Sequence, residues 1–394
     1  MEARPVLNYD ILHLIMSISA TQEVCSLMCT CWLLYREGAK FLLHHVKLED
    51  DRGIQSFTQF MAADPYRRIP YLHSLDLSCG TLTPETAVLL RVFLGLAGPF
   101  LQLHHVLLRK PEDLLRSDPG LVEAFARTYF ISFLAFYQPG ALSFGLLERM
   151  SGVVHSASLH FDRSPTELPE KSNPIFAFRS LRNTLVEVSG HLFTADVTSS
   201  YTSGIVFPHV RRLRLETSTP IHTIDYARAF PNLASLYFSC RPEFYISVDE
   251  EERDDLAVAR ERNCTAMREH GGWSKLQFVD GAMADLWTLG LRSTIAKLKV
   301  LMLPLHEEHR LMAASMFEDL LRDNHIEKLH LNVWTPEATR NALRALSRAS
   351  RDVQHLSLCI QLDEEDSVVG VTEMLVRAPS TSCMPSCSTS LTAT

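Results

Sequence analysis

The chain has 394 residues, of which 46% are hydrophobic and 21% are charged, and it carries a net charge of −8. This balance is typical of a globular protein. It argues against a broad nucleic-acid surface or an anionic-membrane surface, because both need an excess of Lys and Arg. The most apolar long segment, 87–103, is interrupted by Arg91, Gly95, Gly98 and Pro99, so it predicts a buried helix and its turn, not a membrane span.

The first residues do not have the pattern of a secretory signal, because Glu2, Arg4 and Asp10 replace a basic start followed by an uninterrupted apolar run. Nine cysteines are scattered along the chain. Without a signal we expect them to be reduced and buried, and we expect the protein in the cytoplasm, the nucleus or both.

Residues 8–18 predict a first helix with apolar residues on two sides. Asn8 can cap this helix, and Asp10 lies in its first turn, where a negative charge suits the helix dipole. One side carries Ile11, Leu14, Ile15 and Ile18 at helical spacing, and the other carries Leu12 and Met16.

A second helix is expected after a break at 19–21, with Thr21 as its cap and Gly38 at its end. Its apolar residues at helical spacing are Val24, Leu27, Met28, Cys31 and Trp32. A third apolar segment, 40–45, leads to 46–49, which alternates like a strand. Because three short helices form only a marginal core, the surplus apolar residues must cover the following part of the chain or a separate protein.

Residues 49–377 alternate short strands with helices. The strand pattern apolar-x-x-apolar-x-apolar recurs at 72–77, 103–108, 154–159, 210–215, 233–238, 273–278, 298–303, 326–331 and 353–358, with weaker copies at 129–137 and at 181–190, the latter centred on Leu185. Segments 83–98 and 335–350 both open Thr-Pro-Glu, which suits a capped helix start. This alternation predicts an α/β fold: an irregular leucine-rich-repeat solenoid with parallel strands on the concave face and helices outside. An ordinary α/β domain with a parallel sheet is the alternative.

Two further segments differ in composition. The acidic run 249–255 is expected to be a solvated loop or a contact for a basic substrate. Residues 378–394 contain nine Ser or Thr and bury too little apolar area to offset chain entropy. The predicted division is therefore a helical subdomain at 1–48, a solenoid at 49–377 and a disordered tail at 378–394.

No metal, cofactor or catalytic site is predicted. Cys25, Cys29 and Cys31 lack a second ligand pair at zinc-site spacing, and 306–309 lacks the spacing of a His-Glu-x-x-His site. The doublets 44–45 and 104–105 are His pairs in strand-like runs, so each pair is expected to point to opposite faces. No phosphate loop, dinucleotide fingerprint or nucleophile elbow is present, so we do not expect an enzyme.

The first 45 or so residues resemble an F-box, whose pattern runs Leu-Pro-x-Glu-Ile-Leu-x-x-Ile, then a helix ending Val-Cys-x-x-Trp and a Leu-rich tail. Residues 7–15 match the opening and 27–32 match the second signature. Asn8 stands where the family has Pro, and Thr30 and Cys31 stand where basic residues are common. An F-box followed by irregular leucine-rich repeats is a familiar combination.

The resemblance implies a substrate-receptor subunit of an SCF-type cullin–RING ubiquitin ligase, bound to the Skp-type adaptor through the F-box and to an unidentified target protein through the rest. By position, the residues that would bind the adaptor, some of which will instead fill the small helical core, are Leu7, Ile11, Leu14, Ile15, Val24, Leu27, Cys29 and Trp32. The alternatives are a leucine-rich-repeat interaction scaffold with no ligase role, and a helical subdomain that only caps the solenoid.

Overall fold

The structure of the chain is a computed structural model. It describes residues 8–162, 169–193, 204–240, 250–302, 307–333, 336–349, 352–360 and 387–391. The chain forms two compact units, 1–161 and 162–394. Both are α/β, and in each unit the described strand pairs are parallel and join strands that follow one another in the chain.

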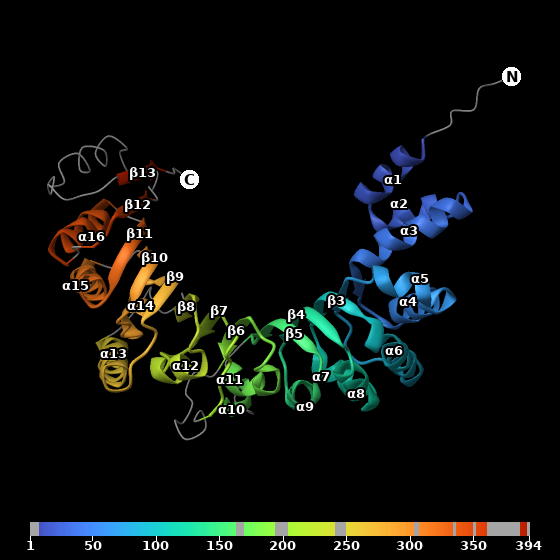
Figure 1. Cartoon of the computed structure of the whole chain (residues 1–394), viewed down its shortest axis with the longest axis horizontal. Coiled ribbons are helices and arrows are strands. Elements are labelled where there is room, and N and C mark those ends of the chain that lie inside the picture. The colour runs from blue at the N-terminus through green and yellow to red at the C-terminus, as the bar shows by residue number, and fades with distance from the viewer. Residues whose placement is uncertain are drawn as a thin grey trace. The chain divides into compact units, whose positions relative to one another are not determined.

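Unit 1 begins with helices and continues as alternating strands and helices (Figure 1). Its strands are β1 (Val46–Leu48), β2 (Ser74–Leu77), β3 (Gln102–Leu108), β4 (Phe130–Tyr137) and β5 (Val153–His160). Its helices are α1 (Tyr9–Ile18), α2 (Thr21–Met28), α3 (Trp32–His44), α4 (Asp51–Ala63), α5 (Pro65–Arg68), η1 (Ile69–Tyr71), α6 (Pro84–Ala97), η2 (Gly98–Phe100), α7 (Pro111–Ser117), α8 (Gly120–Ala126) and α9 (Ala141–Arg149).

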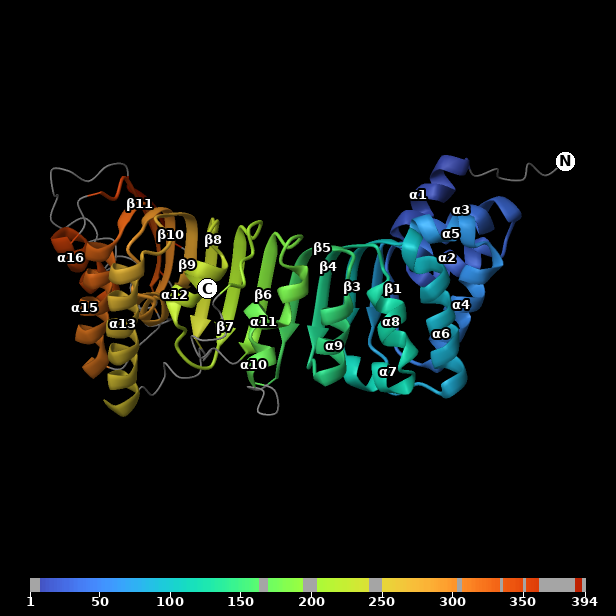
Figure 2. The same cartoon turned by 60° about the horizontal axis from the view of Figure 1, so that its bottom comes forward.

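Unit 2 repeats the alternation, and its strands lie side by side in Figure 2. The strands are β6 (Glu187–Phe193), β7 (Arg212–Thr217), β8 (Ser235–Cys240), β9 (Lys275–Ala282), β10 (Thr294–Met302), β11 (His325–Val333), β12 (His355–Ile360) and β13 (Cys387–Leu391). The helices are α10 (Pro169–Ser172), α11 (Pro174–Ala177), η3 (Arg179–Leu181), α12 (Thr223–Ala229), α13 (Glu250–His270), α14 (Met283–Thr288), α15 (Glu307–Asp323) and α16 (Pro336–Ala349).

Aligned apolar side chains form the core of each unit. In unit 1 the register places Val46, Leu75, Val106, Leu134 and Ala157 in one row across β1–β5. In unit 2 the corresponding row across β6–β12 is Val188, Leu213, Leu236, Val279, Leu298, Leu329 and Leu356. All of these side chains are buried, so each strand completes the apolar cover of its neighbours.

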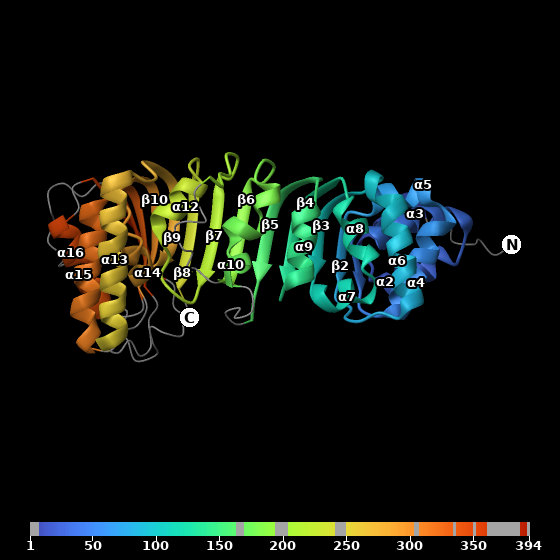
Figure 3. The same ribbon diagram turned by 90° about the horizontal axis from the view of Figure 1, so that it is seen from below.

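The helices of unit 2 lie along one side of its strands. Figures 1 and 3 show α13, α15 and α16 on that side of β9–β12, with α13 and α15 next to each other. Along each strand, exposed or half-buried residues of the other side alternate with buried residues of the helix side. In β11, for example, Lys328 and His330 flank the buried Leu329. One side of the sheet is therefore covered by helices, and the other presents polar side chains.

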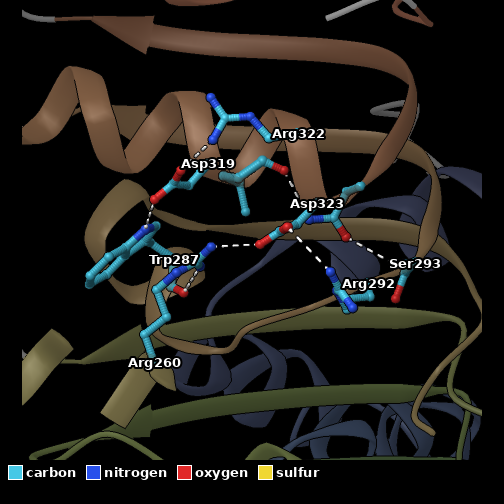
Figure 4. A network of polar contacts seen from close by, with 9 residues as sticks. Arg260, Trp287, Arg292, Ser293, Asp319, Arg322 and Asp323 are labelled. Carbon is cyan, nitrogen blue, oxygen red and sulfur yellow. Dashed lines mark hydrogen bonds and ion pairs between the residues drawn. The ribbon is translucent and has the colours of Figure 1, made fainter. Parts of the chain in front are cut away.

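A polar network fastens these helices to one another (Figure 4). Arg260 of α13 donates to an Asp323 carboxylate oxygen at 2.6 Å and to the Trp287 carbonyl at 2.7 Å. Its guanidinium also lies 4.8 Å from the Trp287 ring centroid, and the Trp287 indole donates to Asp319 at 3.3 Å. Three helices, α13, α14 and α15, are joined by these contacts.

The N-terminal helices differ from the expectation in where the second one ends. Asn8 caps α1 as predicted, since its side chain accepts from the Asp10 N–H at 3.2 Å. The expected second helix is divided at Cys29–Cys31 into α2 and α3, and Gly38 lies inside α3 instead of ending it. The predicted third apolar segment, 40–45, belongs mostly to the same helix α3. At Gly38 the helices α1 and α2 approach α3 closely through Met16 and Met28. The spacing of apolar residues does not distinguish such a glycine from one that ends a helix.

The predicted strands occur, but three of them are aligned differently. The expected patterns at 273–278 and 298–303 have their central, fourth residues at 276 and 301. In β9 and β10 the buried residues of the central row are instead Val279 and Leu298, each three positions away. The degenerate copy expected at Leu185 is centred on Val188. Gly281 occupies an inward position of β9, where a Cβ would collide with the Phe238 carbonyl oxygen. Because glycine is not counted as apolar, the strand pattern centred on Val279 was not recognised.

Three other expectations need correction. Residues 250–255 begin α13, so most of the acidic run is helical and not a loop. Residues 387–391 of the expected disordered tail form β13, which pairs with β12, and the rest of that tail lies outside the described residues. Thr83 precedes α6 without a side-chain bond to a backbone N–H, because its hydroxyl instead lies 3.0 Å from an Asp51 carboxylate oxygen, to which it donates, and 2.9 Å from the Thr86 hydroxyl.

Candidate functional site

Helix α1 has one buried and one exposed apolar side. Met16 is 1% exposed, and Leu12 packs against the same core cluster. On the other side Ile11, Leu14 and Ile18 are 47%, 60% and 79% exposed. The first side belongs to the fold, and the second is an apolar surface that this chain leaves uncovered among the described residues.

The buried side of α1 is part of a small core that joins the first three helices. This cluster consists of Met16, Val24, Met28 and Leu34, with Leu12, Leu27, Phe41, Leu42 and Phe60 packed against it. Phe60 belongs to α4, so the cluster also fastens the three helices to the rest of unit 1. The cluster thereby holds the three helices in place against α4.

Helix α3 also carries exposed aromatic side chains. Trp32 is 67% exposed, and the Arg36 guanidinium lies 5.0 Å from its ring centroid. Leu33 and Tyr35 are 41% and 43% exposed. Trp, Tyr and Arg are the residue types that most often dominate binding energy at protein interfaces. We refer to Ile11, Leu14, Ile18, Trp32, Leu33 and Tyr35 together as the N-terminal apolar surface.

A buried arginine helps to orient α3. Arg68 is 5% exposed, donates to the Tyr35 hydroxyl at 2.8 Å and to the Phe60 carbonyl, and lies 3.8 Å from the Phe60 ring centroid. Since buried charges are costly unless they are hydrogen-bonded, these contacts hold α3, α4 and α5 in one arrangement. Tyr35 is therefore a partly exposed residue with a fixed hydroxyl.

The residues predicted to bind the adaptor fall into four groups. Ile11, Leu14, Cys29 and Trp32 are exposed, and Ile15 and Leu27 are half-buried. Val24 is 2% exposed inside the core cluster, so we correct its assignment from partner contact to core residue. Leu7 lies outside the described residues. The helical rhythm that selected these residues could not distinguish inward from outward positions.

The structure also adds Ile18, Leu33 and Tyr35, which were not among the predicted contacts. Helical spacing puts Ile18 on the same side of α1 as Ile11 and Leu14, and that side is exposed. The spacing therefore contained the information needed to predict Ile18 as a surface residue. The exposure of Leu33 and Tyr35 could not be predicted. The expected helix continued through 29–31, and this assigned the residues of α3 to the wrong sides of the helix.

A second apolar surface lies between α4, α5 and α6. It is a groove of about 740 Å³, lined on its exposed side by Tyr66, Leu89, Val92, Leu96 and Phe100. Leu96 and Phe100 are each 72% exposed, whereas Leu90 and Leu94 on the inner side of α6 are fully buried. The segment 87–103 was predicted to be a buried helix, and this is wrong for its outer side.

Histidines from the two doublets meet at a third histidine. The His73 ring centroid lies 5.4 Å from that of His44 and 5.0 Å from that of His104. Burial lowers the pKa of His73, and the neighbouring His104 and His44 lower it further. Each doublet thus contributes one ring to this cluster. His104 lies in β3, but His44 is the last residue of α3, which corrects the expectation that both doublets lie in strand-like runs.

The described residues offer no alternative centre of metal chemistry. In those ranges no group of three or more His, Cys, Asp or Glu side chains is placed to hold a metal ion. Cys25, Cys29 and Cys31 are exposed, which corrects the expectation that the cysteines are buried, although Cys79 and Cys264 are. No helix within the described part of the chain combines the length and apolarity of a membrane span.

Comparisons with known proteins assign no family. No family model matches the chain, and no curated protein matches it.

Proposed function

We propose that this chain is the substrate-receptor subunit of an SCF-type cullin–RING ubiquitin ligase. In this proposal the N-terminal apolar surface binds the Skp-type adaptor, and the strand-and-helix repeats, read as a leucine-rich-repeat-like solenoid, bind the target protein. The chain itself performs no bond chemistry. It raises the local concentration of a target lysine near the charged ubiquitin carrier.

The two-sided character of α1 carries the proposal. Leu12 and Met16 satisfy the fold, while Ile11, Leu14 and Ile18 form an exposed apolar row at helical spacing. An exposed row of this kind fits a helix that inserts into the apolar groove of another protein. Because residues 7–32 resemble an F-box, we infer that this other protein is the Skp-type adaptor.

The strand arrangement supports the receptor half of the proposal. Each strand pairs with its sequence neighbours, and in unit 2 one side of the strands is free of helices in the described ranges. Repeats of this type create extended surfaces for other proteins. A scaffold of the same architecture without a ligase role remains the second candidate.

Co-purification of the adaptor tests the proposal. We expect the adaptor to be recovered with the full chain, and the double variant Leu14→Asp/Ile18→Asp to lower its affinity more than 30-fold, because truncated hot spots typically cost about 2 kcal/mol or more each. The matched control is Leu96→Asp, which places the same charge on an equally exposed leucine of α6 and should leave recovery unchanged.

Two outcomes would contradict the proposal. Adaptor recovery that is equal for the wild type and the double variant would remove the N-terminal apolar surface from the interface. If the folded wild-type chain recovers target proteins but no adaptor, the scaffold function is correct instead.

A further inference from the structure

Two lysines lie side by side on the helix-free side of unit 2. The register pairs Lys297 of β10 with Lys328 of β11, and both side chains are exposed. Neighbouring strands are about 4.8 Å apart, so the two ammonium groups share one small region of surface. Like charges directly opposite each other on adjacent strands destabilise a sheet.

No carboxylate of the described residues neutralises this pair. The Lys297 ammonium lies 5.6 Å from the Phe278 ring centroid and, like that of Lys328, makes no ion pair with Glu327 or any other described acidic residue. The neighbouring Lys299 differs, because its ammonium lies 3.0 Å from the Asp280 carboxylate. Lys297 and Lys328 are therefore a local excess of positive charge in a chain whose net charge is −8.

The pair belongs to a row that suits an extended ligand. The register continues from Phe278 through Lys297 and Lys328 to His355, so an aromatic ring flanks the lysines on one side and an imidazole on the other. A polypeptide lying across the strands along this row would meet one apolar contact and two ammonium groups in succession.

We propose that Lys297 and Lys328 bind a run of Asp or Glu carboxylates in an extended segment of a partner protein. The inference deepens the proposed function, on which it rests, by naming the chemistry of the target segment. The bidentate fork that matches both carboxylate and phosphoryl groups belongs to arginine, so the two lysines act as two separate point charges for successive carboxylates of one extended chain. The two arginines on this side, Arg212 and Arg214, are already paired with Glu187 and Glu216 at 2.9 and 2.7 Å.

Binding of labelled peptides to the full chain, followed by fluorescence anisotropy, tests the inference. The probes are an Asp/Glu-rich peptide, its Asn/Gln counterpart and a phosphoserine peptide. Each is about 12 residues long, so that at roughly 3.3 Å per residue it spans the row. We expect the acidic peptide to bind most tightly, and the double variant Lys297→Gln/Lys328→Gln to weaken it about 10-fold or more. The affinity should also fall with salt, as it does for exposed charges.

Lys275→Gln is the matched control. Lys275 is an exposed lysine of β9, but its register partner is Thr294 and not a second lysine, so its replacement should change the affinity less than twofold. Equal binding of the acidic and Asn/Gln peptides, or no effect of the double variant, would overturn the inference. Tighter binding of the phosphoserine peptide than of the acidic peptide would overturn it as well.

Adaptor recovery separates this inference from the proposed function. The Lys297→Gln/Lys328→Gln variant should recover the adaptor like the wild type. Lost peptide selectivity with intact adaptor recovery would reject the lysine pair alone, whereas selective peptide binding by a chain that recovers no adaptor would reject the ligase role alone.

Discussion

Gly38 of α3 lies directly against Met28 of α2, so closely that a Cβ at position 38 would be 2.6 Å from the Met28 sulfur. The same Cβ would be 2.6 Å from the Met16 methyl group of α1. The three helices that carry the N-terminal apolar surface thus converge at one residue without a side chain, and their mutual arrangement depends on that absence.

Replacement of Gly38 by Ala should lower the free energy of unfolding by about 1–2 kcal/mol, because overpacking costs more than the helix propensity gained. Gly95 of α6 is the matched control, since a Cβ there would meet no atom within 4 Å. Gly95→Ala should raise stability by about 0.5–1 kcal/mol. Urea denaturation followed by circular dichroism measures both, and equal shifts in the two variants would contradict the close approach.

Val24 and Leu14 should respond oppositely in stability and in binding. Val24→Ala should cost about 2 kcal/mol of stability, because the side chain is 2% exposed in the core cluster. Leu14→Ala should change stability by less than about 0.5 kcal/mol, because the residue is 60% exposed, yet it should weaken adaptor binding. Thermal denaturation with adaptor titration distinguishes the two; a large stability loss in Leu14→Ala would place that residue in the core.

Asp285 should make stability depend on pH. Its side chain is fully buried, one carboxylate oxygen accepts from the Cys240 N–H at 2.8 Å, and burial raises its pKa well above the usual value of 3.8. The folded state therefore holds this proton more tightly than the unfolded state. Its contribution to stability is complete below the unfolded pKa and is lost as the pH rises from there through the folded pKa.

Asp285→Asn keeps an acceptor for the Cys240 N–H and removes the titration. Relative to the wild type, this variant should gain stability as the pH rises from 4 to 8, by up to about 1.4 kcal/mol per pH unit within the titration window. Unfolding free energies at several pH values test this. Parallel pH profiles for the two proteins would show that Asp285 does not titrate differently in the folded state.

Arg260 should stabilise the helix layer of unit 2. Loss of its bonds to Asp323 and to the Trp287 carbonyl in Arg260→Ala should cost about 1–3 kcal/mol. Arg116→Ala is the control, because the Arg116–Asp113 pair is 3.4 Å long and largely exposed and such pairs contribute little. A double-mutant cycle of Arg260→Ala with Asp323→Asn measures the coupling energy between the two side chains. A coupling energy near zero would show that this ion pair does not stabilise the fold.

The sequence predicted the alternation of strands and helices because burial repeats along the chain. Leu75, Val106, Leu213 and Leu329 are the fourth residues of the patterns at 72–77, 103–108, 210–215 and 326–331, and the register confirms each of them as a strand centre. Apolarity was misleading in β10, where the pattern matches equally well at 295–300 and at 298–303. Only pairing with β11, which aligns Leu298 with Leu329, decides between these two alignments.

The candidate site was predicted in composition but not in detail. Apolar residues on two sides of 8–18 were visible, yet which side is buried depends on α2, α3 and Phe60 of α4, a residue some forty positions further along the chain. The lysine pair was not predicted, because Lys297 and Lys328 are neighbours only through strand register. Pairings of this kind become visible only when the repeats are placed next to one another.

The strictly sequential strand pairing described for unit 2 has a mechanical consequence. Under a tension applied along the stack the strand junctions would give way one after another, since none of the described strands is clamped between partners from distant parts of the chain. A repeat of roughly 30 residues would release about 100 Å of contour length when it detaches. Force–extension traces of this protein should consist of a series of small similar steps and not one large rupture.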